Sequence, residues 1–547
     1  MSKTIVQTQD IEAIINAMTL EEMCGQVMNF SCSPKSFEEF KKIVPKVCPG
    51  GIFVSNVDGE WIAEVTKYIN QNVRIPVIVS ADIENGIGCC LKNMPVVPEP
   101  MAWGACDDEE LVEQMGIITG ELCRKNGIHW NFAPIVDINY NKDNSVTNTR
   151  AISDSPKQVA KIAGAYVRGM QKNGMMIAGS KHFPGDGVDD RNQHYCTTIN
   201  SFTKEKWLET YGYVYKKMFE AGTASVMVGH IACPAFEDEI DPVMGPKPGT
   251  LSHNIMTKLL RQTLGYEGCI VSDAMSMIGA CAMCPPDQLA IEFFNAGGDM
   301  LLFALERDYD CVLEAVKSGI IPVDRLKDAV RHVLEMKKRA RLFEDQKQLG
   351  QSVGSSGNIE EVSMKIAEKS IKIIRNTQDL LPLKLKKGAR FLMINFQEVG
   401  EKKLVAPFIQ ELDTVARELE SRGYEVDSVM ACDVDHNWVN QVKDGYDCIL
   451  LNCRVSSRDY LGCTLRINRD NIMPLWRGAA LDHPCVVFTS FGDPYKLYEF
   501  PYLKTYVNAF SSQKDTQKAF VKVLLGEITP KAKNPVGLIG FFDREVE

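Results

Sequence analysis

The sequence predicts an α/β protein of two domains, and three features of the chain lead to this class. Its 547 residues exceed the usual length of one domain. Short apolar runs alternate with longer helical patterns up to residue 345, as in a parallel sheet covered by helices on both faces. After a polar stretch the same alternation starts again. We therefore predict an N-terminal (β/α)8 TIM-type barrel over 1–345, a linker over 346–360 and a C-terminal α/β (flavodoxin-like) sandwich domain over 361–547.

Eight apolar runs are the expected barrel strands. They are Gly25–Phe30, Gly51–Ser55, Pro76–Asp82, Trp130–Asp137, Met176–His182, Ser225–His230, Cys269–Asp273 and Asp299–Phe303. Helical patterns flank them, including Ala13–Asn29, which passes into the first strand, and Ala274–Ala280 after the seventh. Polar residues gather where the runs end: Asp82, Glu84, Asp137, Lys181, His182, His230 and Asp273. Because such barrels carry chemistry at the carboxyl ends of their strands, these side chains predict one shared site.

The second domain follows a change in composition. The helix Val323–Arg341 closes the first domain, and Gln346–Asn358 is rich in Gly, Ser and Gln, as linkers are. Beyond it, Ile359–Asn376 has a helical pattern. Strands are expected at Arg390–Phe396, Glu425–Met430, Cys448–Cys453 and Pro484–Ser490, with helices between them. This alternation predicts an open, mostly parallel sheet.

The amino-acid composition limits the classes of partner that the protein is expected to bind. The formal net charge of -10 and the absence of a long Lys/Arg cluster argue against binding to nucleic acid or to an anionic membrane. The N-terminus has no apolar leader, and no stretch approaches the roughly 20 apolar residues that span a bilayer. The 18 cysteines are scattered and often lie in apolar runs, which favours buried thiols over a disulfide framework. We expect a cytoplasmic protein that acts on a small molecule; the oligomeric state stays open.

Chemistry is expected in the stretch from Lys181 to His194 and at Asp273. The stretch holds one lysine, two histidines and three aspartates in 14 positions, more titratable groups than a connecting loop needs. Asp273 follows an apolar strand, where an ionised carboxylate can act as a nucleophile that forms an ester. The alternative is that Asp273 only caps the helix expected after it.

Other residues have both a functional and a structural interpretation. Lys181 and His182 can bind vicinal hydroxyls, although Lys181 can equally pair with a barrel carboxylate. Asp82 is a second hydroxyl acceptor, and Arg150 has a fork of donors for hydroxyl oxygens or for a carboxylate. His194 has the side chain of an acid/base near neutral pH, or is a histidine in an exposed loop.

Cofactor and metal motifs are weak, and we expect neither a cofactor nor a metal. Cys281-Ala-Met-Cys284 is a single C-x-x-C without a second pair, so a zinc site is not predicted. Asp186-Gly-Val-Asp-Asp190 lacks the spacing and the final Glu of a calcium loop. There is no phosphate-binding Gly-Lys-Ser/Thr loop and no G-x-G-x-x-G after a strand.

Several motifs, taken together and in order, resemble glycoside hydrolase family 3 in its β-N-acetylhexosaminidase branch. In the first domain they are Asp82-Ile-Glu-Asn-Gly86, Asn131-Phe-Ala-Pro-Ile-Val-Asp137, Asn148-Thr-Arg150, Lys181-His-Phe-Pro-Gly185, Val226-Met-Val-Gly-His230, Leu251-Ser-His, Leu264-Gly-Tyr-Glu-Gly268 and Ser272-Asp-Ala-Met275. In the second they are Lys372-Ile-Ile-Arg-Asn376, Leu380-Leu-Pro-Leu383 and Phe491-Gly-Asp-Pro-Tyr495.

The resemblance implies a retaining exo-β-glycosidase with a small carbohydrate substrate, first a β-N-acetylhexosaminide. It implies that Asp273 is the catalytic nucleophile and His194 the acid/base. It places a further set of residues at the sugar: Asp82, Arg150, Lys181, His182 and His230. The expected reaction is a double displacement through a glycosyl-Asp273 ester.

The loop that carries His194 departs from the family pattern. The branch has a His where this chain has Asp186, and it ends the loop in Asp-Ser-His, whereas this chain has Asn192-Gln-His194. An amide cannot stabilise an imidazolium as a carboxylate does, so His194 uses another aspartate, works with a lower pKa or is not the acid/base. The other aspartates are Asp186, Asp189 and Asp190, and carboxylic acids of the second domain, such as Glu398 and Glu401, are further acid/base candidates.

Three alternatives to a hexosaminidase therefore stay open. The first is a β-glucosidase of the same fold. The second is a glycoside phosphorylase, in which an anionic phosphate replaces the activated water. The third is a sugar-binding protein without catalysis, against which the retained Asp273 counts, because binding needs no nucleophile.

Overall fold

The computed structural model describes residues 10–174, 176–344, 346, 353–397, 411–455 and 466–547. The chain divides into two compact units. The first comprises Met1–Val96, Val112–Asp137 and Ala163–Ile359, and the second comprises Val97–Leu111, Ile138–Ile162 and Glu360–Glu547. Residues 347–352 of the expected linker and both candidate glutamates, Glu398 and Glu401, lie outside the described residues. The domain boundaries at 345 and 361 stay a prediction.

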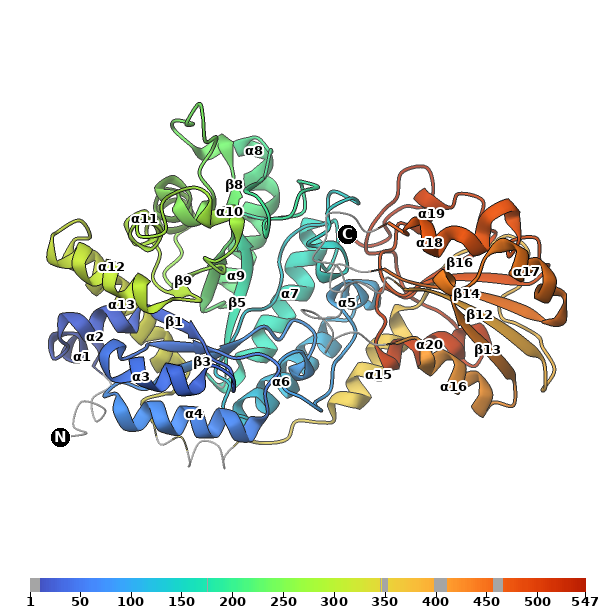
Figure 1. Cartoon of the computed structure of the whole chain (residues 1–547), viewed down its shortest axis with the longest axis horizontal. Helices are drawn as coiled ribbons and strands as arrows, with labels where there is room; N and C mark the ends of the chain where they lie inside the picture. Colours follow the sequence, from blue (N-terminus) through green and yellow to red (C-terminus); the bar gives the residue numbers. More distant parts are fainter. Residues whose placement is uncertain (1–9, 175, 345, 347–352, 398–410, 456–465) are drawn as a thin grey trace. The chain divides into compact units, whose positions relative to one another are not determined.

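The first unit is built on a parallel sheet that nearly closes into a barrel (Figure 1). Its strands in the described part of the chain, in spatial order, are β10 (Leu301–Leu302), β1 (Met28–Ser31), β2 (Gly51–Phe53), β3 (Ile78–Ala81), β4 (Trp130–Asn131), β5 (Ile177–Phe183), β7 (Ser225–Val228) and β9 (Cys269–Ser272). A parallel bridge between Val271 and Met300 brings the last strand beside the first. The predicted barrel is confirmed.

Helices alternate with these strands. They are α1 (Ile11–Asn16), α2 (Leu20–Gln26), α3 (Phe37–Val47), α4 (Gly59–Asn72), α6 (Glu109–Lys125), α7 (Pro156–Met170), α8 (Lys204–Trp207), α9 (Tyr213–Glu220), α10 (Ile278–Cys281), α11 (Leu289–Ala296), α12 (Glu306–Lys317) and α13 (Val323–Arg339). The barrel interior is apolar and aromatic: Phe132 stacks on Phe53 and meets Trp130 edge to face at 4.6 Å between ring centroids.

Three expected segments differ from the structure for local reasons. The helix expected over Ala13–Asn29 is two helices, because Thr19 and Glu22 form a capping box that starts α2 anew. The strand expected over Trp130–Asp137 keeps only its first two residues, and Pro134, which has no N–H, lies in the part that leaves the ladder. The helix expected over Ala274–Ala280 begins only at Ile278.

The second unit contains a six-stranded sheet within the described residues. Its order is β11 (Lys372–Asn376), β16 (Thr505–Asn508), β15 (Val486–Ser490), β14 (Cys448–Arg454), β12 (Arg390–Gln397) and β13 (Glu425–Met430). All neighbours are parallel except β11 and β16. The helical pattern expected over Ile359–Asn376 is therefore half wrong: α15 (Ile359–Ser370) ends and β11 follows. The strand β16 was not expected either.

Both faces of this second sheet are covered. Leu392 and Ile394 of β12 belong to one apolar core, and Phe391 and Met393 belong to the other, as side chains that alternate along a strand require. The helices of the unit are α5 (Pro100–Cys106), α16 (Asp413–Ser421), α17 (His436–Val442), α18 (Arg469–Ile472), α19 (Lys496–Glu499) and α20 (Lys514–Leu524). The predicted α/β sandwich is confirmed.

None of the helices in the described residues has the length and apolar character needed to cross a bilayer.

Candidate active site

The predicted side chains of the barrel meet because their strands are close neighbours. Asp82 follows β3, Lys181 and His182 lie at the end of β5, His230 lies two residues beyond β7, and Asp273 follows β9. In the sheet these strands run in the order β3, β4, β5, β7, β9, all parallel. Their carboxyl ends therefore share one rim of the barrel.

Lys181 lies between two carboxylates. Its Nζ is 2.7 Å from Asp82 Oδ1 and 2.9 Å from Glu84 Oε1. The lysine and Glu84 side chains are buried, whereas the Asp82 side chain is 47% exposed. Asp82 thus has a carboxylate edge that faces solvent, beside a cation whose position is fixed.

His182 points at Asp273 and is supported from behind by Asp137. His182 Nδ1 lies 2.7 Å from Asp137 Oδ2, and His182 Nε2 lies 4.0 Å from Asp273 Oδ2. Asp137 is fully buried. The sequence predicts Asp137 at a strand end and in a family motif, without a role.

Asp273 is a fixed carboxylate, with 14% of its side chain exposed. Its Oδ1 accepts from the backbone N of Ala274 at 2.7 Å, and its own N donates to Val228 O at 2.8 Å. Burial alone would raise the pKa of Asp273, but the positive charge of neighbouring side chains, His182 foremost, holds that pKa below its ordinary value. The carboxylate is therefore ionised near neutral pH. Because α10 begins at Ile278, Asp273 is not its cap.

His230 supports the peptide that follows Asp273. Its ring is buried, with Nε2 3.0 Å from Ala274 O and Nδ1 2.9 Å from Thr250 Oγ1. A carbonyl oxygen only accepts, so Nε2 carries the proton. Burial lowers the pKa of His230, which fits a neutral ring. Both ring nitrogens thus have partners inside the protein.

His194 is held by Asn192. One amide oxygen, Asn192 Oδ1, lies 2.7 Å from His194 Nδ1 and accepts from the His194 backbone N at 2.9 Å. Since this oxygen only accepts, Nδ1 carries a proton and Nε2 is the nitrogen that can gain or lose one. His194 is half-buried, and its charge is among those that act on Asp273.

Two of the three aspartates considered as partners for His194, Asp186 and Asp189, have other contacts. Asp189 binds Arg191, with Nη2 2.6 Å from Oδ2, and accepts from the backbone N of Ile199 at 2.8 Å. Asp186 Oδ1 accepts from the backbone N of Gly187 at 2.7 Å. These contacts direct the two carboxylates to backbone N–H groups and to an arginine.

The loop that carries His194 is anchored at both ends. Near its start, the backbone N of Asp186 donates to Asp137 Oδ1 at 2.8 Å, and Tyr211 Oη donates to Asp186 O. At its end, the backbone N of Ile278 donates to His194 O at 3.1 Å. Gly185 makes the first turn with φ of 116°, and a Cβ there would lie 2.2 Å from the Tyr211 ring.

Arg150 belongs to the second unit. It ends a 3-10 turn over Asn148–Arg150, and its Nη1 donates to Val146 O at 2.9 Å. Its predicted contact with the sugar stays a prediction.

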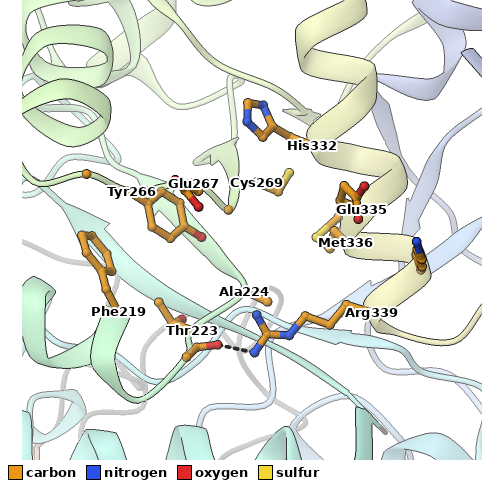
Figure 2. A pocket seen from close by; sticks show the side chains of 14 residues that line it. Phe219, Thr223, Ala224, Tyr266, Glu267, Cys269, His332, Glu335, Met336 and Arg339 are labelled. Carbon is orange, nitrogen blue, oxygen red and sulfur yellow. Dashed lines mark hydrogen bonds between the residues drawn. The ribbon is translucent and has the colours of Figure 1, made fainter. Parts of the chain in front are cut away.

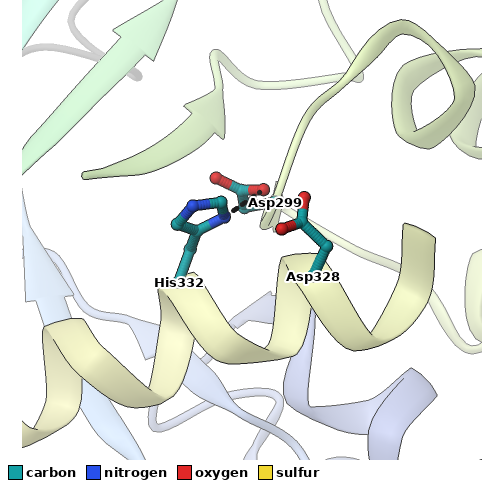
Figure 3. A group of neighbouring side chains, drawn as sticks. All are labelled: Asp299, Asp328 and His332. Atoms are coloured by element: carbon teal, nitrogen blue, oxygen red, sulfur yellow. Dashed lines mark hydrogen bonds and ion pairs between the residues drawn. The ribbon is translucent and has the colours of Figure 1, made fainter. Parts of the chain in front are cut away.

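A second cluster of charged groups involves α13 (Figure 3). Asp299, Asp328 and His332 bring one ligand atom each within 4.8 Å of one another, as metal ligands do. Asp299 is also bound by Arg261 and by Arg325, the latter at 2.8 Å. Two guanidinium groups already neutralise Asp299, so this cluster is an ion-pair network rather than a cation site.

A cavity of about 590 Å³ opens at the other end of the barrel strands (Figure 2). Ala224, just before β7, and Cys269, the first residue of β9, line it together with Met336 and Arg339 of α13. His230 and Asp273 follow the opposite ends of those strands, so this cavity is separate from the candidate active site.

Comparison with known proteins identifies the family. The family model described as "Glycosyl hydrolase family 3 N terminal domain" matches residues 19–336. A curated relative from Cellulomonas fimi, named beta-N-acetylglucosaminidase/beta-glucosidase, is 27% identical over 508 residues, which are 89% of this chain and 88% of the relative.

Two solved structures are similar over nearly the whole chain. One is the beta-glucoside phosphorylase BglX bound to 2FGlc, with a TM-score of 0.85 and 26% identity, covering 98% of this chain and 97% of that one. The other is a glycoside hydrolase family 3 beta-N-acetylglucosaminidase from Paenibacillus sp. str. FPU-7, with a TM-score of 0.83 and 25% identity, covering 95% and 99%. With the family match over more than half of the chain, these similarities show that the protein belongs to glycosyl hydrolase family 3 and is a glycoside hydrolase.

Proposed function

We propose that the protein is a retaining exo-β-glycosidase that removes a terminal β-N-acetylhexosamine through a covalent glycosyl-Asp273 intermediate. The observation that carries this proposal is the state of Asp273: a partly exposed carboxylate, fixed by Ala274 N and held ionised by neighbouring positive charge. Such a group is ready to attack an anomeric carbon. The cytoplasm is the proposed location, and a small carbohydrate is the proposed substrate.

The first step forms the ester. An Asp273 oxygen bonds to the anomeric carbon while the bond from that carbon to the leaving oxygen breaks, and His194 Nε2 gives its proton to the leaving oxygen. In the second step His194 Nε2 takes a proton from water, the water oxygen bonds to the anomeric carbon, and the Asp273 carboxylate leaves. The β configuration is restored by two inversions.

Sugar hydroxyls are the proposed ligands of the rim. The half-exposed Asp82 carboxylate accepts from a hydroxyl, and the Lys181 and His182 side chains donate to oxygen atoms. Arg150 is proposed as a further donor. His230 has a less direct role in this proposal, since its ring nitrogens contact Thr250 and Ala274 O.

Phosphorolysis is a second candidate, and Asn192 favours it. Water must lose a proton to attack the ester, whereas phosphate is already an anion and needs less help from a base. The partner of His194 Nδ1 is a neutral amide, which adds no negative charge beside the incoming nucleophile. A β-glucoside phosphorylase is among the similar structures.

The proposal is tested with nitrophenyl N-acetyl-β-glucosaminide and nitrophenyl β-glucoside, each with and without phosphate, using wild type and Asp273→Asn. We expect hydrolysis of the first substrate, lost in the variant. Preference for the glucoside makes the enzyme a β-glucosidase, and turnover that requires phosphate and releases a sugar phosphate makes it a phosphorylase. Sugar binding without any turnover would instead support a binding protein.

A further inference from the structure

Asp137 is a buried carboxylate that contacts two parts of the candidate site at once. It follows the β4 segment, and its side chain has no exposed surface. Its Oδ2 lies 2.7 Å from His182 Nδ1. Its Oδ1 accepts from the backbone N of His182 at 3.1 Å and from the backbone N of Asp186 at 2.8 Å.

Each oxygen has a separate consequence. The contact with Oδ2 fixes the His182 ring so that its far nitrogen, Nε2, lies 4.0 Å from Asp273 Oδ2. The contacts with Oδ1 fix the chain on both sides of the turn through Gly185, where the loop that ends in His194 begins. One carboxylate therefore sets the direction of a sugar-binding ring and the start of the acid/base loop.

The chemistry of these contacts requires an acceptor. The two backbone groups can only donate, and a carboxylate that receives them on Oδ1 leaves Oδ2 to accept from the ring. Nδ1 of His182 thus keeps its proton in both the neutral and the charged ring. The nitrogen that faces Asp273 is then free to exchange its proton with solvent or sugar.

We propose that Asp137 is a positioning residue for the reaction: it holds the proton on His182 Nδ1, keeps Nε2 directed at Asp273, and anchors the loop of His194. The role in turnover rests on the proposed function of Asp273. The hold on the ring does not, because it follows from the contacts of Asp137 alone.

The substitution Asp137→Asn keeps the shape of the side chain but moves the ring proton of His182 from Nδ1 to Nε2. The two backbone N–H groups retain the amide oxygen at the place of Oδ1, so the amide nitrogen faces His182 Nδ1. An amide nitrogen only donates, so Nδ1 must give up its proton and the ring becomes neutral with hydrogen on Nε2. The positive charge that lowers the pKa of Asp273 is lost.

We therefore expect two changes in the variant. The acid limb of the profile of kcat/KM against pH moves to higher pH, since Asp273 must now be ionised without the charge of His182. At neutral pH kcat/KM falls by about 100-fold, as when an orienting partner of a site residue is lost.

Asp299→Asn is the matched control. Asp299 is also fully buried and also contacts a histidine, with His332 Nδ1 3.1 Å from its Oδ1, but it precedes β10 at the other end of the barrel. This variant is expected to lose stability and to keep the acid limb of the wild type. If Asp299→Asn moves the acid limb as far as Asp137→Asn does, the proposed role of Asp137 is wrong.

A second measurement needs neither turnover nor a folded variant of Asp137. Nitrogen NMR of the wild type with ¹⁵N-labelled histidine, assigned through His182→Gln, reports which ring nitrogen of His182 carries hydrogen. We expect a proton on Nδ1 at every pH, and a lone pair on Nδ1 near neutral pH would overturn the inference. If the wild type cleaves no glycoside, the proposed function fails while this spectrum still decides what Asp137 does.

Discussion

Asn192 holds His194 through a single amide oxygen, which lies 2.7 Å from the ring Nδ1 and 2.9 Å from the backbone N of the same histidine. This contact gives the ring its orientation and places the exchangeable proton on Nε2. It does not supply the negative charge that stabilises an imidazolium. The direction of the acid/base candidate and its basicity are thus set by different features, and they can be changed separately.

Asn192→Asp is expected to add that charge without moving the ring. A carboxylate oxygen can accept the same two N–H groups, and its charge favours the protonated His194. The basic limb of kcat/KM against pH should then move up by about one to two pH units. The ratio of phosphorolysis to hydrolysis should fall, because the added charge repels phosphate. Rates measured from pH 5 to 10, with and without phosphate, check both.

Asn70→Asp is the control for this change. Asn70 Oδ1 also accepts from a backbone group, the N of Val77 at 3.1 Å, but Val77 lies just before β3, at the opposite end of that strand from Asp82. Its pH profile should match that of wild type. An Asn192→Asp profile that coincides with wild type would mean that His194 does not transfer the proton.

His230→Phe is expected to lower kcat by about ten-fold and to change KM little, as loss of a group that supports a reacting residue does. The ring of His230 contacts Thr250 and Ala274 O, so its removal disturbs the peptide beside Asp273. Steady-state kinetics with a nitrophenyl glycoside separate the two constants. A large rise in KM at unchanged kcat would show instead that His230 binds the sugar directly.

Lys337 makes the stability of the first unit depend on pH. Its buried Nζ donates to Gln26 Oε1 at 2.6 Å and to Pro76 O at 2.8 Å, so its partners in the described chain are neutral. Burial lowers the pKa of Lys337 from 10.5 to about 7. Between these two values the unfolded chain binds a proton that the folded chain has lost, so stability rises with pH across that window.

Lys337→Met removes this dependence. The difference in unfolding free energy, wild type minus variant, should increase from pH 7 to about 10.5 with a slope of at most about 1.4 kcal/mol per pH unit. Urea unfolding at pH 6, 7, 8 and 9 measures it. The exposed neighbour Lys338, changed to Met, should give a difference that stays flat. A flat difference for Lys337→Met as well would show that the ammonium stays charged when folded.

Gly185→Ala should distort the loop that carries His194. The backbone φ of 116° is unfavourable for a residue with a Cβ, and that Cβ would lie 2.2 Å from the ring of Tyr211. We expect a lower melting temperature and at least about a ten-fold loss of kcat/KM, because a displaced His194 no longer reaches the substrate. Gly245→Ala has a comparable φ of 79° with open space around the Cβ, and it separates backbone strain from the collision. Equal effects of the two variants would mean that Tyr211 does not matter.

Much of the fold is predictable because apolar runs are local signals. Runs such as Gly51–Ser55 and Met176–His182 correspond to β2 and β5 within a few residues. Errors arise where a contact between segments distant in the sequence, rather than the local pattern, determines the secondary structure. β11 pairs with β16, more than a hundred residues later, and neither strand has an alternation strong enough to reveal the other.

The site is predictable only as far as the ends of the strands can be located in the sequence. Lys181, His182, His230 and Asp273 were expected together from their places after strands, and the barrel unites them. The proposed role of Asp137 and the hydrogen-bond partners of His230 were not accessible, since they depend on which ring nitrogen meets which oxygen. The Asp137 motif was visible, but a buried acceptor is recognised only when its donors are placed around it.

The most direct test of the central claim is to trap the covalent intermediate. A fluorinated β-glycoside of the sugar that the enzyme turns over, with a fast leaving group, forms the ester quickly and hydrolyses slowly. We predict that intact-mass spectrometry of the wild type shows the gain of one glycosyl group, that peptide mapping places it on Asp273, and that Asp273→Asn shows no gain. An adduct on another residue, or an active wild type that neither forms an adduct nor slows with this reagent, would contradict the account.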